Sequence, residues 1–190
     1  PITRKERTAS GRDGTASRMA DGMPAAETEI SAELVLALLA EQHPDLAARI
    51  VRFENEGWDS AIFRLGDDLA VRLPRRAMNA ASLPGELRWL PELQAQLPLP
   101  ISAAVRVGEP GCGYPWAWSI TPWFSGASWA DTDVRDPFQA APTLCWFVRA
   151  LVVDAPDDPP SHPHRGGPLR DRPPYFRHRL APPGSPIRPP

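Results

Sequence analysis

Ala70 and Arg72 have the types and the spacing of residues that hold a phosphorylated ring compound. They belong to a short apolar stretch, residues 69–73, which we expect to be a β-strand, where residues two apart face the same side. A small side chain such as that of Ala70 leaves room for a flat base, and the planar charged fork of Arg72 matches phosphate oxygens. Glu86 follows near the start of a predicted helix, where it can pair with Arg72 and hold it in place.

A turn with the sequence EGWDS, residues 56–60, lies between two predicted strands. Backbone N–H groups in such a turn can cover phosphates, although this turn contains a single glycine. The ordinary alternatives are that Gly57 and Asp59 are simple turn residues, and that Arg72 and Glu86 form a surface ion pair. The surrounding pattern favours the binding interpretation.

The elements that would position these residues begin with an amphipathic helix. Ser31 can cap it, Leu34, Leu38 and Leu39 fall on one face, and it ends near His43. Further along the chain, the pattern predicts five short strands and two more helical regions. The strands are residues 50–54, 61–65, 69–73, 103–107 and 117–122, and the helical regions are residues 82–97, divided by Pro91, and residues 138–153. The fold class is therefore α+β, with an antiparallel sheet of about five strands.

Charge and cysteine content exclude several classes of function. A formal net charge of −2 and a pI near 6.1 give no basic field, so neither nucleic acid nor an anionic membrane is an expected partner. Cys112 and Cys145 match no disulfide framework or CxxC motif, which indicates a reducing cytoplasm and inert thiols. His162, His164 and His178 lack acidic or cysteine partners at ligand spacing, so we expect no metal site there.

A helix followed by five strands, with helical structure between the third and the fourth, is the plan of a kinase small lobe. The segments EGWDSAIFRLGDDLAVRLPRR, GELRWLPELQAQLPLP and VGEPGCGYPWAWSITPWFSG together resemble the aminoglycoside phosphotransferase family. The likeness covers roughly residues 30–172 and is strongest to members with arginine in the third strand. It implies a small lobe at residues 30–125 and a linker with the first helix of a large lobe at residues 126–153. We expect residues 1–29 to be a disordered leader and residues 154–190 a Pro-rich disordered tail.

The resemblance also implies a nucleotide site, for ATP or GTP with Mg²⁺. In the family, the segment that matches residues 119–124 is the hinge between lobes, whose backbone hydrogen-bonds the base. We therefore expect the nucleotide to contact Gly57, Trp58, Asp59, Ser60, Ala70, Arg72, Glu86, Ile120, Thr121 and Trp123. Four tryptophans could form a stacking platform, but we expect most of them to pack in the core and at the hinge; they are Trp116, Trp118, Trp123 and Trp129.

The residues that transfer a phosphoryl group are missing from the sequence. This chemistry needs an Asp at the attacking hydroxyl, and an Asn and a second Asp for magnesium. None of the four histidines is followed by Gly-Asp or Arg-Asp, and no Asp begins a later Phe-Gly type motif. We therefore expect no catalytic residue, no protein ligand for the metal and no turnover by this chain, which resembles a truncated kinase.

The family reaction implied by the resemblance is phosphorylation of a hydroxyl on a small molecule, such as an aminoglycoside or macrolide antibiotic. Two alternatives remain open from the sequence. One is a non-catalytic nucleotide- or protein-binding module, and the other is an inert gene fragment produced by a frameshift or a misplaced gene end.

Overall fold

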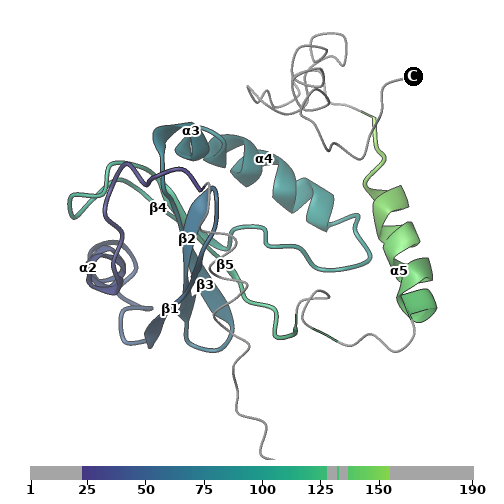
Figure 1. Ribbon diagram of the computed structural model, residues 1–190, viewed down its shortest axis with the longest axis horizontal. Helices are drawn as coiled ribbons and strands as arrows, with labels where there is room; N and C mark the ends of the chain where they lie inside the picture. Colours follow the sequence, from purple (N-terminus) through teal and green to yellow (C-terminus); the bar gives the residue numbers. More distant parts are fainter. Residues whose placement is uncertain (1–22, 128–131, 133–136, 155–190) are drawn as a thin grey trace, which may run out of the picture.

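The computed structural model describes residues 23–127, 132 and 137–154. Its centre is a five-stranded antiparallel sheet with the strand order β1-β2-β3-β5-β4 (Figure 1). The strands are β1 (Val51–Glu56), β2 (Ser60–Leu65), β3 (Leu69–Pro74), β4 (Arg106–Gly108) and β5 (Trp118–Pro122). The helices are α2 (Ala32–Gln42), α3 (Ala77–Ala80), α4 (Leu83–Gln94) and α5 (Pro137–Ala150). The α+β class and the five-stranded sheet predicted from the sequence are confirmed.

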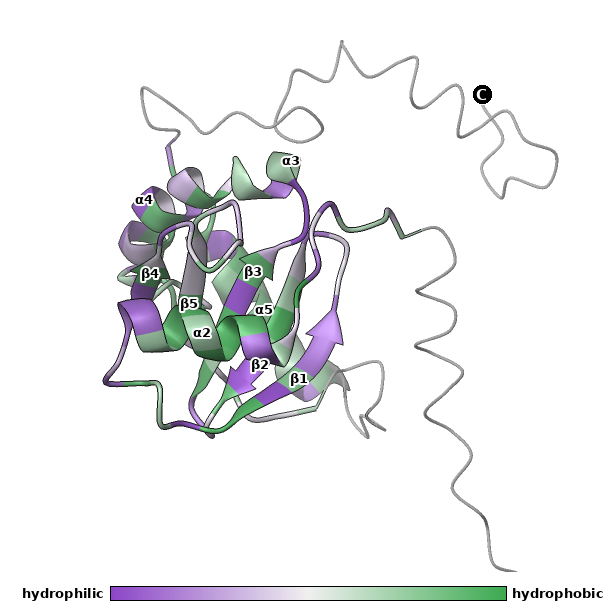
Figure 2. Ribbon diagram, turned by 90° about the vertical axis from the view of Figure 1, so that its left-hand side faces the viewer, coloured by the Kyte–Doolittle hydropathy of each residue, from purple (hydrophilic) through white to green (hydrophobic). Residues whose placement is uncertain are grey.

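Helix α2 begins where the sequence predicts. The Ser31 hydroxyl accepts a hydrogen bond from the Leu34 N–H at 3.3 Å, which satisfies one of the donors that every helix N-terminus leaves unpaired. Val35, Leu38 and Leu39 are fully buried against the sheet, which α2 crosses in Figure 2. This contact closes the hydrophobic core.

Strict alternation of burial along β2, together with the pairing of β2 with β3, divides the sheet into two faces. Ala61, Phe63 and Leu65 of β2 are buried, while the residues between them are only partly covered. On the same buried face, the neighbouring strands add Val71, Leu73, Trp118 and Ile120. Because side chains of a strand alternate, Arg72 and Thr121 must point to the other face. We call the α2 side the core face and the other side the cleft face.

The segment between β3 and β5 differs from the sequence-based prediction in two ways. Pro91 neither ends nor divides the helix: α4 runs unbroken over Leu83–Gln94. The exposed ring of Pro91 lies near the C-terminal end, where a missing N–H costs one hydrogen bond only. The predicted strand at residues 103–107 is shorter and lies later, at Arg106–Gly108, although the Val105 N–H still bonds the Ile120 carbonyl at 2.8 Å.

The described chain also differs from the predictions near both of its ends. Residues 23–29 fall in the predicted leader, yet Pro24 and Glu27 hydrogen-bond to Arg75. These contacts join residues 24–27 to the end of β3. Helix α5 lies on the opposite side of the sheet from α2 (Figure 1) and ends at Ala150, before the predicted end at residue 153. The predicted tail lies outside the described residues apart from Asp154, and within the described part no helix is long and apolar enough to cross a membrane.

Candidate nucleotide site

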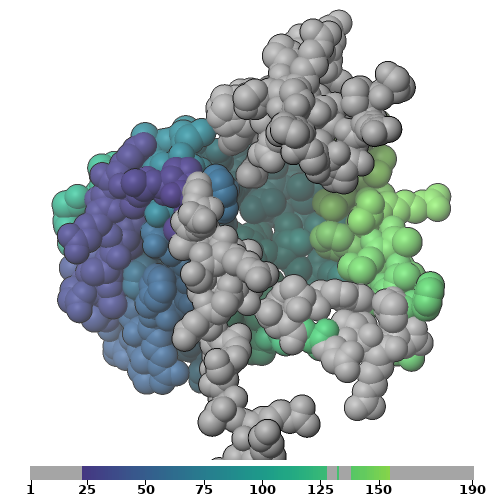
Figure 3. Space-filling model, viewed as in Figure 1, coloured from purple at the N-terminus to yellow at the C-terminus, as the bar shows by residue number. Residues whose placement is uncertain are grey.

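An open cleft of about 430 Å³ lies against the cleft face of the sheet. Figure 3 shows the molecular surface hollowed between the sheet and α5. The cleft is lined by Ile62, Ala70, Arg72, Ser102, Thr121, Pro122, Trp123 and Phe124. Four of these residues, Ala70, Arg72, Thr121 and Trp123, are among the candidates named from the sequence. The volume is within the range of about 300–1,000 Å³ that small-molecule sites occupy.

Arg72 and Glu86 form the ion pair that the sequence predicts. Arg72 Nη1 donates to Glu86 Oε2 at 3.1 Å, and both side chains are partly covered. Glu86 stands in the first turn of α4, where the positive end of the helix dipole favours a carboxylate. A narrow pocket beside the pair is lined by Ser60, Leu83 and Ser119, so Arg72 lies between the main cleft and the turn at residues 56–60.

Ala70 and Thr121 form the centre of the cleft wall. They are directly opposite each other in the pairing of β3 with β5, and both are almost fully buried. Ile62 of β2 adds an apolar side chain beside them. This part of the cleft wall therefore consists of small or apolar side chains, which leave room for a flat ring.

The three predicted hinge residues differ in whether they face the cleft and in whether their backbone groups are already hydrogen-bonded. Ile120 lies in the core, and its carbonyl already accepts the Val105 N–H. The Trp123 N–H donates to the Asp68 carbonyl at 2.8 Å, while the Trp123 ring lines the cleft and lies 4.6 Å from the guanidinium carbon of Arg64. Thr121 faces the cleft. Pro122 and Phe124, which sequence reasoning did not name, also line it. Both have the same parity along the chain as the core residue Ile120, so alternation in β5 gives no signal for them.

No residue of the turn at residues 56–60 lines the main cleft. Ser60 lines the narrow pocket beside Arg72. The ends of the turn are joined by a 3.0 Å hydrogen bond from the Gly57 N–H to the Ser60 carbonyl. Trp58 is exposed at the tip, and Asp59 Oδ1 accepts the Asn79 side-chain amide at 2.7 Å. A Cβ at Gly57 would meet only the Ser60 carbonyl, at 3.8 Å, so neither space nor backbone angle demands a glycine there.

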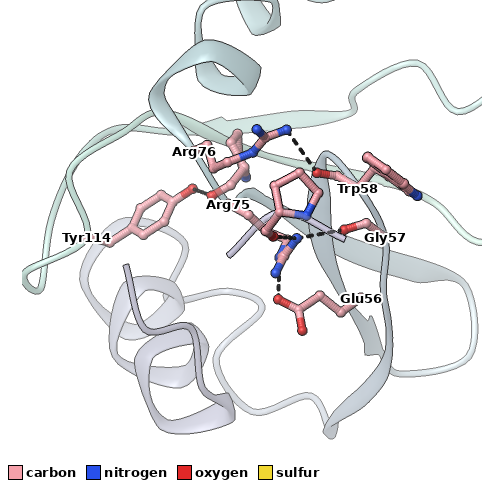
Figure 4. A network of polar contacts seen from close by, with 8 residues as sticks. Glu56, Gly57, Trp58, Arg75, Arg76 and Tyr114 are labelled. Carbon is pink, nitrogen blue, oxygen red and sulfur yellow. Dashed lines mark hydrogen bonds and ion pairs between the residues drawn. The ribbon is translucent and has the colours of Figure 1, made fainter. Parts of the chain in front are cut away.

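Sequence reasoning missed Arg75, which is the most buried charged side chain near this turn. Its guanidinium contacts Glu56, the carbonyl of Gly57 and the carbonyl of Pro24 (Figure 4). The sequence carries the adjacent pair Arg75-Arg76 at the end of the third strand, but nothing in the pattern distinguishes a buried arginine from an exposed one.

The sequence signature described as the phosphotransferase enzyme family matches residues 50–186. The chain belongs to this family. The match includes the turn, β3 with Arg72, the α4 segment with Glu86 and the cleft-lining end of β5.

Solved structures similar to this phosphotransferase family member share its fold. The GDP complex of wild-type aminoglycoside 2'-phosphotransferase-IIIa superposes with a TM-score of 0.57 and 21% identity, over 64% of this chain and 42% of that one. The GDP and kanamycin complex of APH(2")-IIia gives 0.54 and 20%, over 62% and 40%. The chain thus spans about two fifths of the length of these proteins. No curated protein matches it.

The described part of this phosphotransferase lobe contains no cluster of His, Cys, Asp or Glu that could hold a metal ion. Both cysteines are free and exposed. The pKa of the Cys112 thiol is raised by its hydrogen bond to Glu41 and further by the negative charge of that carboxylate. Burial raises the pKa of Tyr114, whose hydroxyl donates to the Pro74 carbonyl at 2.8 Å. Trp118 is in the core as predicted, and Trp129 lies outside the described residues.

Proposed function

We propose that this lobe binds a purine nucleoside triphosphate, ATP or GTP, as the nucleotide-holding part of a small-molecule phosphotransferase. The observation that carries the proposal is the Arg72–Glu86 ion pair at one end of a cleft whose other end is the segment following β5. An arginine restrained by a carboxylate is oriented but keeps donors for phosphate oxygens, because a guanidinium has five N–H groups.

The base would lie against Ala70 and Ile62, where the wall of the cleft is apolar. A base edge also needs a backbone donor and an acceptor. Pro122 has no N–H, and the Trp123 N–H is already bound to Asp68. We therefore assign the base-edge contacts to the Pro122 carbonyl and the Phe124 N–H. Thr121, which is closer to Arg72 along β5, would face the base through its side chain.

Magnesium would enter with the phosphates of the nucleotide, since the described residues offer no carboxylate cluster to hold it. Bound magnesium supplies charge neutralisation to the phosphates. In this lobe, Arg72 positions the phosphates and the cleft excludes water from the base. None of the 190 residues forms the His-Gly-Asp or His-Arg-Asp motif that would activate an acceptor hydroxyl. We propose that the chain by itself does not transfer a phosphoryl group.

The acceptor in the proposed family reaction is a hydroxyl of a small molecule. Kanamycin is named with GDP in one similar structure, and gentamicin is named in another, which superposes with a TM-score of 0.50. An aminoglycoside is therefore the acceptor class we propose for the complete enzyme. A role in antibiotic resistance would follow from that acceptor class.

Titration calorimetry with ATP and with GTP, each with magnesium, tests nucleotide binding directly. We expect the Arg72→Ala variant to bind at least about tenfold more weakly, because a hydrogen bond to a charged phosphate contributes about 1.5–3 kcal/mol. Arg52→Gln is the matched control, since Arg52 lies exposed on the edge strand β1. Absence of heat at millimolar nucleotide would refute the proposal.

A Gly57→Ala variant separates a ligand role of the turn from a folding role. The added methyl group meets nothing closer than 3.8 Å, so we expect unchanged stability. If phosphates lie close to the turn, the affinity for nucleotide should fall while the melting temperature stays constant. Equal affinity in both proteins would remove Gly57 from the proposed site.

The exposed apolar residues of α5 favour a second candidate function, that of a protein-binding module. Trp146 of this helix is 63% exposed, and Val152, which follows the helix, is 80% exposed. Exposed apolar patches of this kind often mark contact sites. A Trp146→Ala variant with unchanged behaviour in sedimentation and unchanged solubility would argue against this second function.

A further inference from the structure

Arg75 is a buried arginine that joins the end of β3 to two other segments, one at Pro24 and one at Glu56 and Gly57. Its side chain is 5% exposed and stands at the end of β3. It donates to the Gly57 carbonyl at 3.2 Å, to the Pro24 carbonyl at 3.1 Å and to the Glu56 carboxylate (Figure 4). A buried guanidinium is costly unless its donors and its charge are satisfied, so this arrangement holds the three segments together.

The carbonyls of Gly57, Trp58 and Asp59 all face the connection between β3 and α3. The Gly57 carbonyl accepts from Arg75 Nη1, the Trp58 carbonyl from Arg76 Nη2 at 3.5 Å, and the Asp59 carbonyl from the Arg75 backbone N–H at 3.0 Å. Figure 4 shows the two side-chain contacts. The two arginines thus hold one edge of the turn by its oxygen atoms.

The planar peptide bond determines the direction in which the N–H groups of the turn point. In a trans peptide, the N–H of the next residue points away from the carbonyl, and the described residues contain no cis peptide. The N–H groups of Trp58, Asp59 and Ser60 therefore point away from the carbonyl partners on Arg75 and Arg76. Consecutive N–H groups on one side of a turn form a concave site that favours anions.

A short segment near the N-terminus, residues 24–27, also contacts Arg75. Besides the Pro24 carbonyl, which binds the Arg75 side chain, the Glu27 N–H donates to the Arg75 carbonyl at 2.9 Å. The Glu27 carboxylate accepts the Ala77 N–H at 2.8 Å, at the start of α3. We call residues 24–27 the strap, because they contact Arg75 through both its side chain and its backbone.

We infer that Arg75 and the strap are positioning elements for the phosphate groups of the nucleotide, acting through the orientation of the turn at residues 57–59. This inference rests on the proposed function. Arg75 itself touches no ligand in this scheme. Its loss should free the carbonyls of the turn and weaken binding in proportion to the number of phosphates, while the base site at Ala70 and Phe124 is unaffected.

The test compares ligands that differ only in phosphate. Calorimetry or a competition assay gives the affinity for the nucleoside and for its magnesium triphosphate, and their ratio measures the contribution of the phosphates. Arg75→Lys keeps the charge but loses the fork, Glu56→Gln keeps Arg75 but removes its counter-charge, and Glu27→Ala loosens the strap. Arg52→Gln is again the control. We expect the ratio to fall at least about tenfold in Arg75→Lys, the size of one lost charge-assisted hydrogen bond, and severalfold in the other two variants.

Hydrogen exchange of the free protein supplies a readout that a global loss of stability would not imitate. In Arg75→Lys, amides of residues 57–60 should exchange faster, while amides of α2 and β5 stay protected. If the parent chain binds nucleotide and Arg75→Lys has the same ratio of affinities, the inference about Arg75 is overturned and the proposed function stands. A parent chain that binds no nucleotide overturns the proposed function and the inference with it.

Discussion

The core face and the cleft face of the sheet are built from alternate residues of the same strands, yet their surroundings differ. On the core face, Phe63, Val71 and Ile120 are sealed beneath α2. On the cleft face, their neighbours Ile62, Arg72 and Thr121 surround open space. A shift of one residue in register would exchange the two sets, so the apolar core fixes which residues reach the cleft.

This comparison indicates that stability and binding are separable in the lobe. Residues of the core face should control the free energy of unfolding, and residues of the cleft face should control affinity for nucleotide. Gly108 and Trp118 belong to the first set, and Arg72 belongs to the second.

Removal of a large core-face side chain should have the largest effect. Phe63→Ala deletes a ring that is 1% exposed and contacts Phe53 edge-to-face. We expect a loss of about 3–5 kcal/mol in the free energy of unfolding, measured by urea denaturation. Ile62→Ala, the next residue on the cleft face, should cost markedly less. Equal losses at the two positions would show that the cleft face is packed as tightly as the core.

A methyl group added at Gly108 should be the next most damaging change. The Cβ of an alanine would lie 1.9 Å from Trp118 Cε2, so the indole could not keep its place across β4. Overpacking of this kind costs about 1–3 kcal/mol. Gly126→Ala is the control, because nothing lies within 4 Å of its added methyl. A Gly108→Ala protein as stable as the parent would mean that Trp118 can move freely in the core.

The cleft face should show the reverse balance. Arg72→Ala removes a partly exposed ion pair, and such pairs contribute about 0–1 kcal/mol to stability. We therefore expect a small change in the midpoint of urea denaturation beside the large loss of nucleotide affinity proposed above. A loss of stability as large as that of Phe63→Ala would place Arg72 among the structural residues instead.

Most helices and strands could be predicted because the residues that cap a helix or alternate along a strand are close together in the sequence. The cap at Ser31 and the two strands around Gly66 both appear in short windows of sequence, and the structure confirms them. The pairing of Arg72 with Glu86 was predicted too, because its position matches the pair that a strand lysine and a helix glutamate form in kinases. Pro91 was misjudged because its cost depends on its place near the end of an exposed helix.

The missed features depend on contacts between distant segments. Pro24 and Gly57 are far from Arg75 in sequence, and only the folded chain shows that both carbonyls accept from one guanidinium. The engagement of the Trp123 N–H by Asp68, which moves the proposed base contact to Phe124, is likewise a tertiary effect. Neither leaves a pattern in composition or periodicity.

The smallest predicted effect concerns the polar contacts that fasten α2, the helix of the core face, to the turn between β4 and β5. Cys112 Sγ donates to Glu41 Oε2 at 2.9 Å, which raises the pKa of the thiol because the hydrogen bond and the nearby negative charge both disfavour the thiolate. Since the thiolate is the reactive form, Glu41→Ala should lower this pKa and speed alkylation of Cys112 near pH 8 by roughly two- to fivefold.

Measurement in a Cys145→Ser background isolates the single thiol, and the rate is followed from pH 7 to 10 by mass spectrometry. Glu41→Gln removes the charge but keeps an acceptor, so its rate should fall between those of the parent and of Glu41→Ala. Glu33→Gln, at the other end of α2, should leave the rate unchanged. If all four proteins reacted alike, α2 and the turn would not be held together in solution at this point, and the core face would be less closed at its edge than Leu38 and Trp118 indicate.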